Sequence, residues 1–278
     1  TPSSASELIR NGHTVIMEKN AGNGIGISDS DYENVGCSIL LKPDEIFKKA
    51  EMIVKVKEPQ LHECALLEPH HLLFTYLHLA ADKPQTEALL KSGCTAIAYE
   101  TVTSVDGSLP LLAPMSEVAG RMSIQAGAHA LEKASGGRGI LLGGVPGVAP
   151  AKVVIIGGGV SGMNAAEMAV GLGADVTIFD RNLNQMRYLD QRFRGAVKTI
   201  YSTAHALEEA LLDADLVVGA VLVKVKLDFG RGPEKDDGNA RFCIGSADVE
   251  GVDQPRREFK HVLPALVLAF GGVARVFD

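Results

Sequence analysis

Three glycines and an aspartate in the second half of the chain have the types and spacing of a dinucleotide-binding loop. Gly157, Gly159 and Gly162 form a G-x-G-x-x-G pattern after an apolar run, and Asp180 ends the next apolar run. In such a loop the first glycine makes a tight turn, the second lets the backbone approach a pyrophosphate, and the third lets the following helix pack closely on the strand. The helix N-terminus then offers free N–H groups and a partial positive charge to the phosphates.

The aspartate indicates which dinucleotide is bound. A carboxylate at Asp180 can bind the 2′-hydroxyl of the adenosine ribose and would repel a 2′-phosphate, which favours NAD over NADP. Arg181 follows it and weakens that preference slightly, because arginine can bind a phosphate. A glycine loop alone is weak evidence, and a simple glycine turn in an α/β core is the alternative. Here, however, strand, glycines, helix, strand and acid occur in order.

Two lysines interrupt an apolar run in the first half of the chain, MIVKVK at 52–57. If this run is one strand, Lys55 and Lys57 share a face, because residues two apart in a strand point the same way. Burying an ammonium group is unfavourable unless it is paired. The residues alone leave two interpretations open: a functional cation, or lysines whose stems lie along a strand edge with their charges in water.

The histidines and cysteines do not predict a metal site. His70 and His71 follow Pro69 and are expected at the surface near a turn, whereas His78 lies in an apolar run typical of a hydrogen-bonded core histidine. These three do not form a convincing ligand set. The four cysteines stand singly, without a C-x-x-C pair, so we expect free thiols in a reducing cytoplasm.

The elements that must position these residues alternate between strands and helices. In the first half, short apolar runs alternate with helical patterns such as 82–93, which should end at Gly93. The second half repeats this alternation after a long helix at 114–133, for which Ser116 is a plausible N-cap. The pattern predicts an α/β fold: two Rossmann-like domains with mainly parallel sheets, the second one a dinucleotide-binding fold.

Composition excludes several other classes of protein. The chain has 278 residues, a net charge of −7 and 46% hydrophobic residues, and its pI is about 5.6. An acidic protein of this kind is not expected to bind nucleic acid. No apolar run approaches the roughly 20 residues of a membrane helix, and the first residues lack the pattern of a signal peptide.

Several stretches of the chain closely resemble the alanine dehydrogenase family, whose wider group includes the nicotinamide-binding subunit of proton-translocating transhydrogenase. The likeness extends over about residues 1–223 and favours the dehydrogenase branch. The stretches are VKVKEP, LFTYLHLAA, AIAYETV, SLPLLAPMSEVAGRM, GGRGILLGGVPGVAPAKVVIIGGG, DRNLNQMRYLD and ADLVVGAVL.

The resemblance implies a role for several residues. Lys57 would contact the carboxylate and keto oxygen of the substrate, while Lys55 would be structural. His78 would be the catalytic proton donor and acceptor at the substrate carbonyl. The remaining residues would bind substrate or cofactor: Tyr76 and Met115 would line the substrate cleft, Ser116 would hold the nicotinamide, and Asp180, Ser202 and Val221 would surround the adenosine.

The implied reaction is the reversible oxidative deamination of L-alanine to pyruvate and ammonia, with hydride transfer to NAD. It belongs to L-alanine catabolism, is expected in the cytoplasm, and is carried out in the family by homo-oligomers, commonly hexamers. Two alternatives stay open. One is the NAD-binding subunit of a transhydrogenase, and the other is a nucleotide-binding remnant without catalytic activity.

The chain departs from the family pattern at both ends. It starts at Thr1-Pro2, after the family's first strand and its substrate-binding arginine, and the likeness stops after Val223 without the family's catalytic I-D-Q-G-G aspartate. A shifted reading frame would account for the charged, turn-rich tail, and poor folding of this segment is the other expectation. We therefore expect little activity from this exact chain. We predict a substrate domain at 1–113 that lacks its first strand, an NAD-binding domain with its linking helix at 114–223, and an atypical tail at 224–278.

Overall fold

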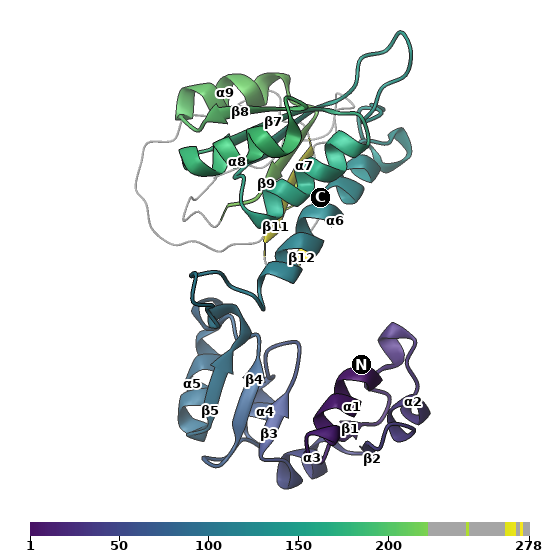
Figure 1. The fold of residues 1–278 in the computed structure, drawn as a ribbon, viewed down its shortest axis with the longest axis vertical. Helices are drawn as coiled ribbons and strands as arrows, with labels where there is room; N and C mark the ends of the chain where they lie inside the picture. Colours follow the sequence, from purple (N-terminus) through teal and green to yellow (C-terminus); the bar gives the residue numbers. More distant parts are fainter. Residues whose placement is uncertain (222–242, 245–264, 271–272, 275–278) are drawn as a thin grey trace. The chain divides into compact units, whose positions relative to one another are not determined.

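The computed structural model describes residues 1–221, 243–244, 265–270 and 273–274 (Figure 1). The chain divides into two compact units, Thr1–Leu109 and Pro110–Asp278, called unit 1 and unit 2 below. Both are built from helices alternating with mostly parallel strands. The predicted α/β fold with mainly parallel sheets is confirmed. No helix in the described part of the chain is both long enough and apolar enough to cross a membrane.

Unit 1 contains two separate parallel sheets, with strand orders β1-β2 and β3-β4-β5. Helices α3, α4 and α5 cover one face of the second sheet through a core that includes Phe47, Cys64 and Leu89 packed with Ile53 and Leu73. The elements are α1 (Pro2–Arg10), β1 (Ile16–Glu18), η1 (Asn23–Ile25), α2 (Asp29–Glu33), β2 (Ser38–Leu40), α3 (Pro43–Lys49), β3 (Met52–Val54), α4 (Leu61–Cys64), β4 (Leu72–Thr75), η2 (Leu79–Ala81), α5 (Lys83–Ser92), β5 (Thr95–Ala98) and η3 (Tyr99–Thr101).

Helix α5 shows how local sequence sets these boundaries. The side chain of Asp82 accepts a hydrogen bond from the backbone N–H of Gln85, which satisfies one of the free donors at the start of the helix. Gly93 ends the helix in the left-handed conformation with φ +69°, which glycine adopts without steric penalty. The predicted stop at Gly93 is confirmed.

The two lysines of the 52–57 run lie outside any strand, because β3 ends at Val54. The Lys55 Nζ atom lies 2.5 Å from a carboxylate oxygen of Glu63 in α4, and the two side chains are only 23% and 15% exposed. Lys57 is exposed, and no described residue forms an ion pair with it. Lys55 is therefore held by a structural partner, and Lys57 remains available to a ligand.

Replacing Glu63 with glutamine should remove a pH-dependent part of the stability of unit 1. Burial alone would raise the pKa of Glu63, but the hydrogen bonds from Lys55 and the Gln60 backbone, with the charge of Lys55, lower it. A carboxyl group whose pKa is lower in the folded chain than in the unfolded chain stabilises the fold at pH values above its unfolded-state pKa of about 4.3. This contribution is lost as the pH falls through the folded-state pKa. We expect urea unfolding at neutral pH to show a loss of about 1–3 kcal/mol for Glu63→Gln.

The difference from wild type should shrink as pH falls below about 4. Glu7→Gln is the matched control, because the Arg10–Glu7 ion pair is 73% and 64% exposed, and such surface pairs contribute about 0–1 kcal/mol. A Glu63→Gln variant whose deficit is the same at every pH would contradict the assignment.

The described strands of unit 2 form one sheet of order β10-β11-β9-β6-β7-β8, with β12 paired to β11. All pairs are parallel except β11 with β12. The elements are α6 (Ala113–Ala130), η4 (Lys133–Ser135), β6 (Lys152–Ile156), α7 (Val160–Gly171), β7 (Asp175–Asp180), α8 (Leu183–Phe193), β8 (Val197–Tyr201), α9 (Ala204–Asp213), β9 (Leu216–Gly219), β10 (Cys243–Ile244), β11 (Ala265–Phe270) and β12 (Val273–Ala274).

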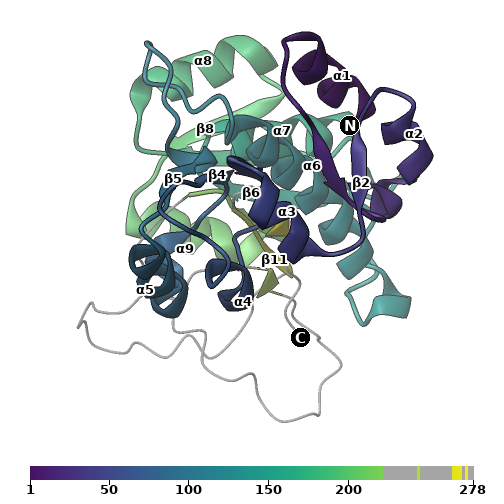
Figure 2. The same cartoon turned by 90° about the horizontal axis from the view of Figure 1, so that it is seen from below.

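The core of unit 2 lies on both faces of this sheet. Val153 and Ile155 face a large cluster that includes residues of α6, α7 and α8. Val154, between them, faces a second cluster that includes residues of α9. Figure 2 shows α8 and α9 on opposite sides of the sheet. Strands buried on both faces explain why β6 is an almost uninterrupted apolar run.

Helix α6 begins three residues earlier than its predicted cap. Leu112 occupies the N-cap position, and Pro114 lies in the first turn, where its fixed φ suits a helix start and its missing N–H is not needed. The prediction of Ser116 as the N-cap is wrong for this reason. Farther along α6, a Cβ atom on Gly120 would lie 2.1 Å from the carbonyl oxygen of Ser161. The close crossing of α6 and α7 therefore requires a glycine.

The predicted atypical tail at 224–278 lies largely outside the described residues. Of this range the structure describes β10, β11 and β12, and β11 runs parallel to β9 from Ala265↔Leu216 to Leu268↔Gly219. The edge of β9 is therefore paired.

Candidate functional site

The glycine loop of unit 2 is shaped by close contacts that exclude side chains. Gly157 has φ +97°, and a Cβ atom there would lie 2.3 Å from the Cγ1 atom of Val221. A Cβ atom on Gly162 would lie 1.8 Å from the carbonyl oxygen of Gly157. The loop is tied to the neighbouring strand by the N–H of Gly157, which donates to the carbonyl of Phe179 over 2.7 Å. Two of the three predicted glycines are thus required by the fold of the loop itself.

Gly159 differs from these two because the protein gives no internal reason for a glycine there. It is the N-cap residue of α7, with φ −67°, and a Cβ atom on it would meet no atom within 4 Å. The space beside it is open at the N-terminus of α7, where the first N–H groups have no partner within the helix. Helix α7 has 12 residues, and the open space at its N-terminus allows a phosphate group to approach closely.

Asp180 supports the loop from the end of β7. One carboxylate oxygen accepts the N–H of Gly158 over 2.6 Å, and the other accepts the N–H of Asn182 over 2.7 Å. Gln185 of α8 donates from its side-chain amide to the carbonyl of Gly158 over 2.6 Å. The peptide groups around Gly158 are therefore held by Asp180 on one side and by Gln185 on the other.

Sequence reasoning missed Gly158 and Gln185. A Cβ atom on Gly158 would lie 2.5 Å from the Cδ1 atom of Leu189, so at this position, a free one in the G-x-G-x-x-G pattern, any side chain would have to displace Leu189. The run of three consecutive glycines at 157–159 was the available signal. No sequence signal marked Gln185, because its hydrogen bond joins α8 to the glycine loop, and only the fold brings these two elements together.

The other predicted site residues of unit 2 lie at the same edge of the sheet. Ser202 follows β8, and its N–H donates to the carbonyl of Asp180 over 2.9 Å. Val221 follows β9 and borders Gly157. Met115 and Ser116 lie in the first turn of α6, and the carbonyl of Ser116 accepts the hydroxyl of Ser161 over 3.0 Å. In parallel sheets, this carboxyl edge is where ligands bind.

The predicted substrate residues of unit 1 also follow the carboxyl ends of parallel strands. Lys57 comes after β3, and Tyr76 and His78 come after β4, which pairs with β3. The hydroxyl of Thr75, fully buried, donates to the carbonyls of Val56 and Lys57 over 3.2 Å and 2.9 Å. This bond joins the ends of β3 and β4, so the backbone of Lys57 is fixed relative to the strand that leads to His78.

His78 is exposed, and its backbone has the unusual left-handed conformation, with φ +48°. Its imidazole stacks on the ring of Tyr76, with ring centroids 5.9 Å apart and planes inclined by 7°. Burial, and to a smaller extent the charge of Glu100, raise the pKa of the Tyr76 hydroxyl. Tyr76 is therefore a neutral support for the imidazole ring of the exposed His78.

The prediction that His71 lies at the surface is wrong. His71 is 2% exposed, and its Nδ1 atom accepts the N–H of Glu68 over 2.8 Å while its Nε2 atom lies 2.7 Å from the carbonyl oxygen of Phe47. It joins the start of β4 to α3, whereas His70 is exposed. In the described part of the chain, no group of three or more His, Cys, Asp or Glu side chains is arranged to hold a metal ion.

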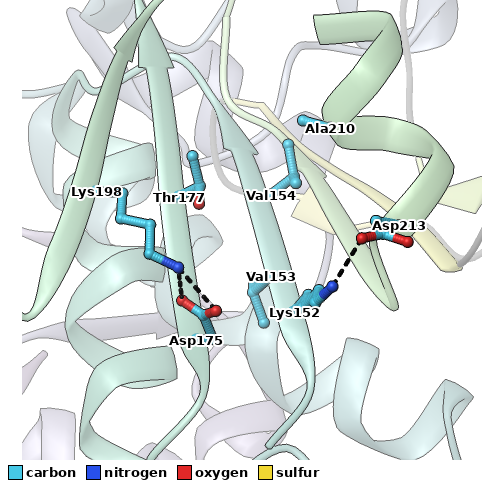
Figure 3. Close-up of a pocket in the computed structure, with 8 residues that line it drawn as sticks. All are labelled: Lys152, Val153, Val154, Asp175, Thr177, Lys198, Ala210 and Asp213. Carbon is cyan, nitrogen blue, oxygen red and sulfur yellow. Dashed lines mark hydrogen bonds and ion pairs between the residues drawn. The ribbon is translucent and has the colours of Figure 1, made fainter. Parts of the chain in front are cut away.

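A pocket of about 180 Å³ lies at the opposite, amino edge of the unit 2 sheet (Figure 3). Its charged groups are already paired: Lys152 with Asp213 and Lys198 with Asp175, both over 2.7 Å. These pairs leave little charge for a ligand, so the carboxyl edge is the stronger candidate site. The lining residues are Lys152, Val153, Val154, Asp175, Thr177, Lys198, Ala210 and Asp213.

Two family domains, one after the other, together match nearly all of the first four-fifths of this chain. The N-terminal domain of the group described as alanine dehydrogenase/PNT matches residues 1–119, and its C-terminal domain matches residues 123–227. Alanine dehydrogenases of Halomonas elongata and Mycobacterium tuberculosis strain H37Rv are 58% and 52% identical over 223 residues, which is 80% of this chain. The chain spans about 60% of the length of these curated relatives.

Solved structures give the same result. An L-alanine dehydrogenase structure superposes with a TM-score of 0.76 at 53% identity, covering 80% of this chain and 62% of that one. A transhydrogenase structure from Sinorhizobium meliloti superposes with a TM-score of 0.66 at 23% identity, covering 80% of this chain and 65% of that one. The second likeness is one of fold alone.

Proposed function

This chain belongs to the alanine dehydrogenase/PNT family, and on that premise we propose that it is an NAD-dependent L-alanine dehydrogenase, an oxidoreductase that interconverts L-alanine with pyruvate and ammonia. The observation that carries the proposal is the pair formed by Lys57 and His78. Both side chains are exposed, and they follow the carboxyl ends of adjacent parallel strands. A cation and an imidazole at one sheet edge suit a small keto acid, which has a carboxylate to bind and a carbonyl to protonate.

In this proposal each side chain has a distinct task. The ammonium of Lys57 binds the substrate carboxylate and lies beside the keto oxygen. His78 takes the proton from the attacking water as the C2 imine is hydrated, and in the reverse direction returns it to the oxygen as water leaves. Histidine suits this exchange because its ordinary pKa lies near neutrality. Tyr76 supports the imidazole, and Met115 would border the substrate.

The residues of unit 2 fit NAD as the cofactor. The open space at Gly159 and the first N–H groups of α7 would receive the pyrophosphate, and Asp180 would receive the ribose hydroxyls. Ser116 would hold the nicotinamide, and Ser202 and Val221 would border the adenosine. When bound, NAD supplies the hydride acceptor for C2 of alanine.

We assign residues 1–113 to the substrate domain and 114–223 to NAD binding, and we propose a homo-oligomer, as the resemblance to the family implies. Turnover tests the central proposal. Purified chain is mixed with NADH, pyruvate and ammonium, and the NADH absorbance is followed. NADH consumption that is slow but requires both pyruvate and ammonium is the expected result, in line with the little activity expected from this exact chain, and a folded chain that binds NADH without any turnover would refute the activity.

Replacing Asp180 with asparagine should change the cofactor preference. Asparagine keeps the shape and one acceptor for the N–H of Gly158, but it removes the negative charge that would repel a 2′-phosphate. We expect NADH to bind about tenfold more weakly and NADPH several-fold more tightly, a change of about 2 kcal/mol in discrimination. Fluorescence titration with both cofactors measures it.

The control for Asp180→Asn is Asp190→Asn, a change on the exposed face of α8 in the same unit. It should leave both dissociation constants unchanged. An unaltered NADH-to-NADPH ratio in Asp180→Asn would mean that this carboxylate supports the loop but does not contact the ribose.

A further inference from the structure

Glu100 reaches from the end of β5 to the backbone that carries His78. It lies in η3, directly after β5, and its carboxylate accepts the N–H of His78 over 2.7 Å. The same carboxylate accepts the N–H of Leu77, at 3.1 Å to one oxygen and 3.3 Å to the other. Because β5 pairs with β4, these bonds join the ends of two neighbouring strands.

The peptide group between Leu77 and His78 is held at both of its polar atoms. Its N–H donates to Glu100, and its carbonyl accepts the side-chain amide of Gln85 over 2.9 Å. Gln85 is 2% exposed, so its side chain cannot easily adopt another conformation. With both atoms bound, the peptide plane cannot rotate, and the direction in which the Cα–Cβ bond of His78 points is set.

This restraint is needed because His78 is in a conformation that a histidine rarely adopts by itself. The left-handed region, here φ +48° and ψ 37°, costs a residue with a Cβ atom about 1–2 kcal/mol. The N–H groups of Leu77 and His78 point to the carboxylate and have no strand partner in the described structure. Hydrogen bonds to a charged acceptor are about twice as strong as neutral ones, which suits them to hold such a conformation.

The ring of His78 is supported from the same direction. Tyr99, the residue before Glu100, contacts the ring of Tyr76 edge to face, with centroids 5.0 Å apart. Tyr76 in turn stacks on the imidazole. The segment at 99–100 therefore restrains His78 twice, through its backbone by Glu100 and through its ring by Tyr99 and Tyr76.

We propose that Glu100 is the positioning residue for His78: its carboxylate keeps the imidazole in the orientation that the reaction needs, without touching the substrate. The inference rests on the proposed dehydrogenase function, since it assigns Glu100 to that same site. It predicts an effect on the chemical step and not on ligand binding. A role in stability alone would instead lower the unfolding temperature and leave the turnover of folded protein unchanged.

Three variants of the full chain test the proposal. Glu100→Ala removes both acceptors, Glu100→Gln keeps one neutral acceptor of the same reach, and Glu87→Ala is the control. Glu87 is an exposed residue of α5 in the same unit, and its Lys83 partner is 3.7 Å away. Turnover is measured with NADH, pyruvate and ammonium and corrected for the folded fraction.

For Glu100→Ala we expect kcat to fall about 10²-fold, the effect of a small misplacement of a reacting group, with KM for pyruvate and Kd for NADH within about twofold of wild type. Glu100→Gln should recover at least about tenfold of that loss, because its amide oxygen can still accept the N–H of His78. Glu87→Ala should behave as wild type. An unchanged kcat in Glu100→Ala, or an equal loss in Glu100→Gln, would overturn the proposal.

A second measurement does not depend on turnover. In wild type, the amides of Leu77 and His78 should exchange slowly with deuterium, and the imidazole protons of His78 should be shifted upfield in the NMR spectrum by the Tyr76 ring. Glu100→Ala should speed exchange at these two amides at least about tenfold and move the imidazole signals, while the amides of β4 remain protected. Unchanged exchange and imidazole signals would refute the positioning role. If the wild-type chain shows no turnover, the proposed function fails, and this second measurement still decides the role of Glu100.

Discussion

Replacing His78 with asparagine is expected to lower kcat by about 10²- to 10⁴-fold, the contribution typical of a general acid–base group. Asparagine is chosen because it tolerates the left-handed conformation better than most residues, so the backbone at φ +48° and its bonds to Glu100 should persist. The amide cannot exchange a proton near neutrality. KM for pyruvate and Kd for NADH should change little, because Lys57 and the glycine loop are untouched.

The measurement is NADH consumption with pyruvate and ammonium over a range of pH, for wild type and variant. His13→Asn is the control, since His13 is exposed in the same unit and distant in sequence from the carboxyl ends of β3 and β4. Circular dichroism should show equal folding for all three proteins. Turnover of His78→Asn within about threefold of wild type would mean that another group transfers the proton.

Replacing Gly162 with alanine is expected to destabilise unit 2 severely and to abolish NADH binding. The added Cβ atom would lie 1.8 Å from the carbonyl oxygen of Gly157 and 2.9 Å from its carbonyl carbon, and both are backbone atoms that cannot rotate away. Either α7 moves off β6 or the loop at Gly157 changes shape. Steric clashes of this kind belong to the small class of changes that cost more than about 4 kcal/mol.

Gly171→Ala is the matched control in the same helix. A Cβ atom on Gly171 would meet nothing within 4 Å, so alanine should be neutral or stabilise the helix by up to about 1 kcal/mol. Urea unfolding gives the stability of both variants, and NADH titration gives the affinity. A Gly162→Ala protein with wild-type stability and affinity would contradict the close packing of α7 on the loop.

The fold class could be predicted from local sequence patterns because the physical features that determine it, the burial of strands and the steric limits of turns, are local. The run VVII at 153–156 is apolar along its whole length, as a strand with both faces buried must be, and it forms most of β6, whose middle residues are buried. Gly157 and Gly162 could be identified for the same reason, since a tight turn and a close approach each exclude a side chain wherever they occur. Gly93 likewise ended α5 as predicted.

Spacing alone did not predict the surroundings of single polar residues where a distant partner determines them, and the surface prediction for His71 was wrong for this reason. His71 follows a proline turn in the sequence, yet it is buried, and the carbonyl of Phe47 in helix α3 accepts a hydrogen bond from its Nε2 atom. Lys55 and Lys57 looked equivalent at alternating positions. Glu63 of α4 distinguishes them, because it pairs with Lys55 alone among the described residues. Neither partner could be assigned from spacing.

By itself the sequence determined the α/β class, the glycine loop with its acid, and the family to which the chain belongs, because periodicity, steric exclusion and extended similarity are all properties of residue order. Only the tertiary structure decided which groups hold the reactive ones: Glu100 and Gln85 on the peptide before His78, Thr75 on the backbone of Lys57, and Gln185 on the glycine loop. These are hydrogen bonds between elements far apart in the chain, and their partners become neighbours only when parallel strands align their carboxyl ends.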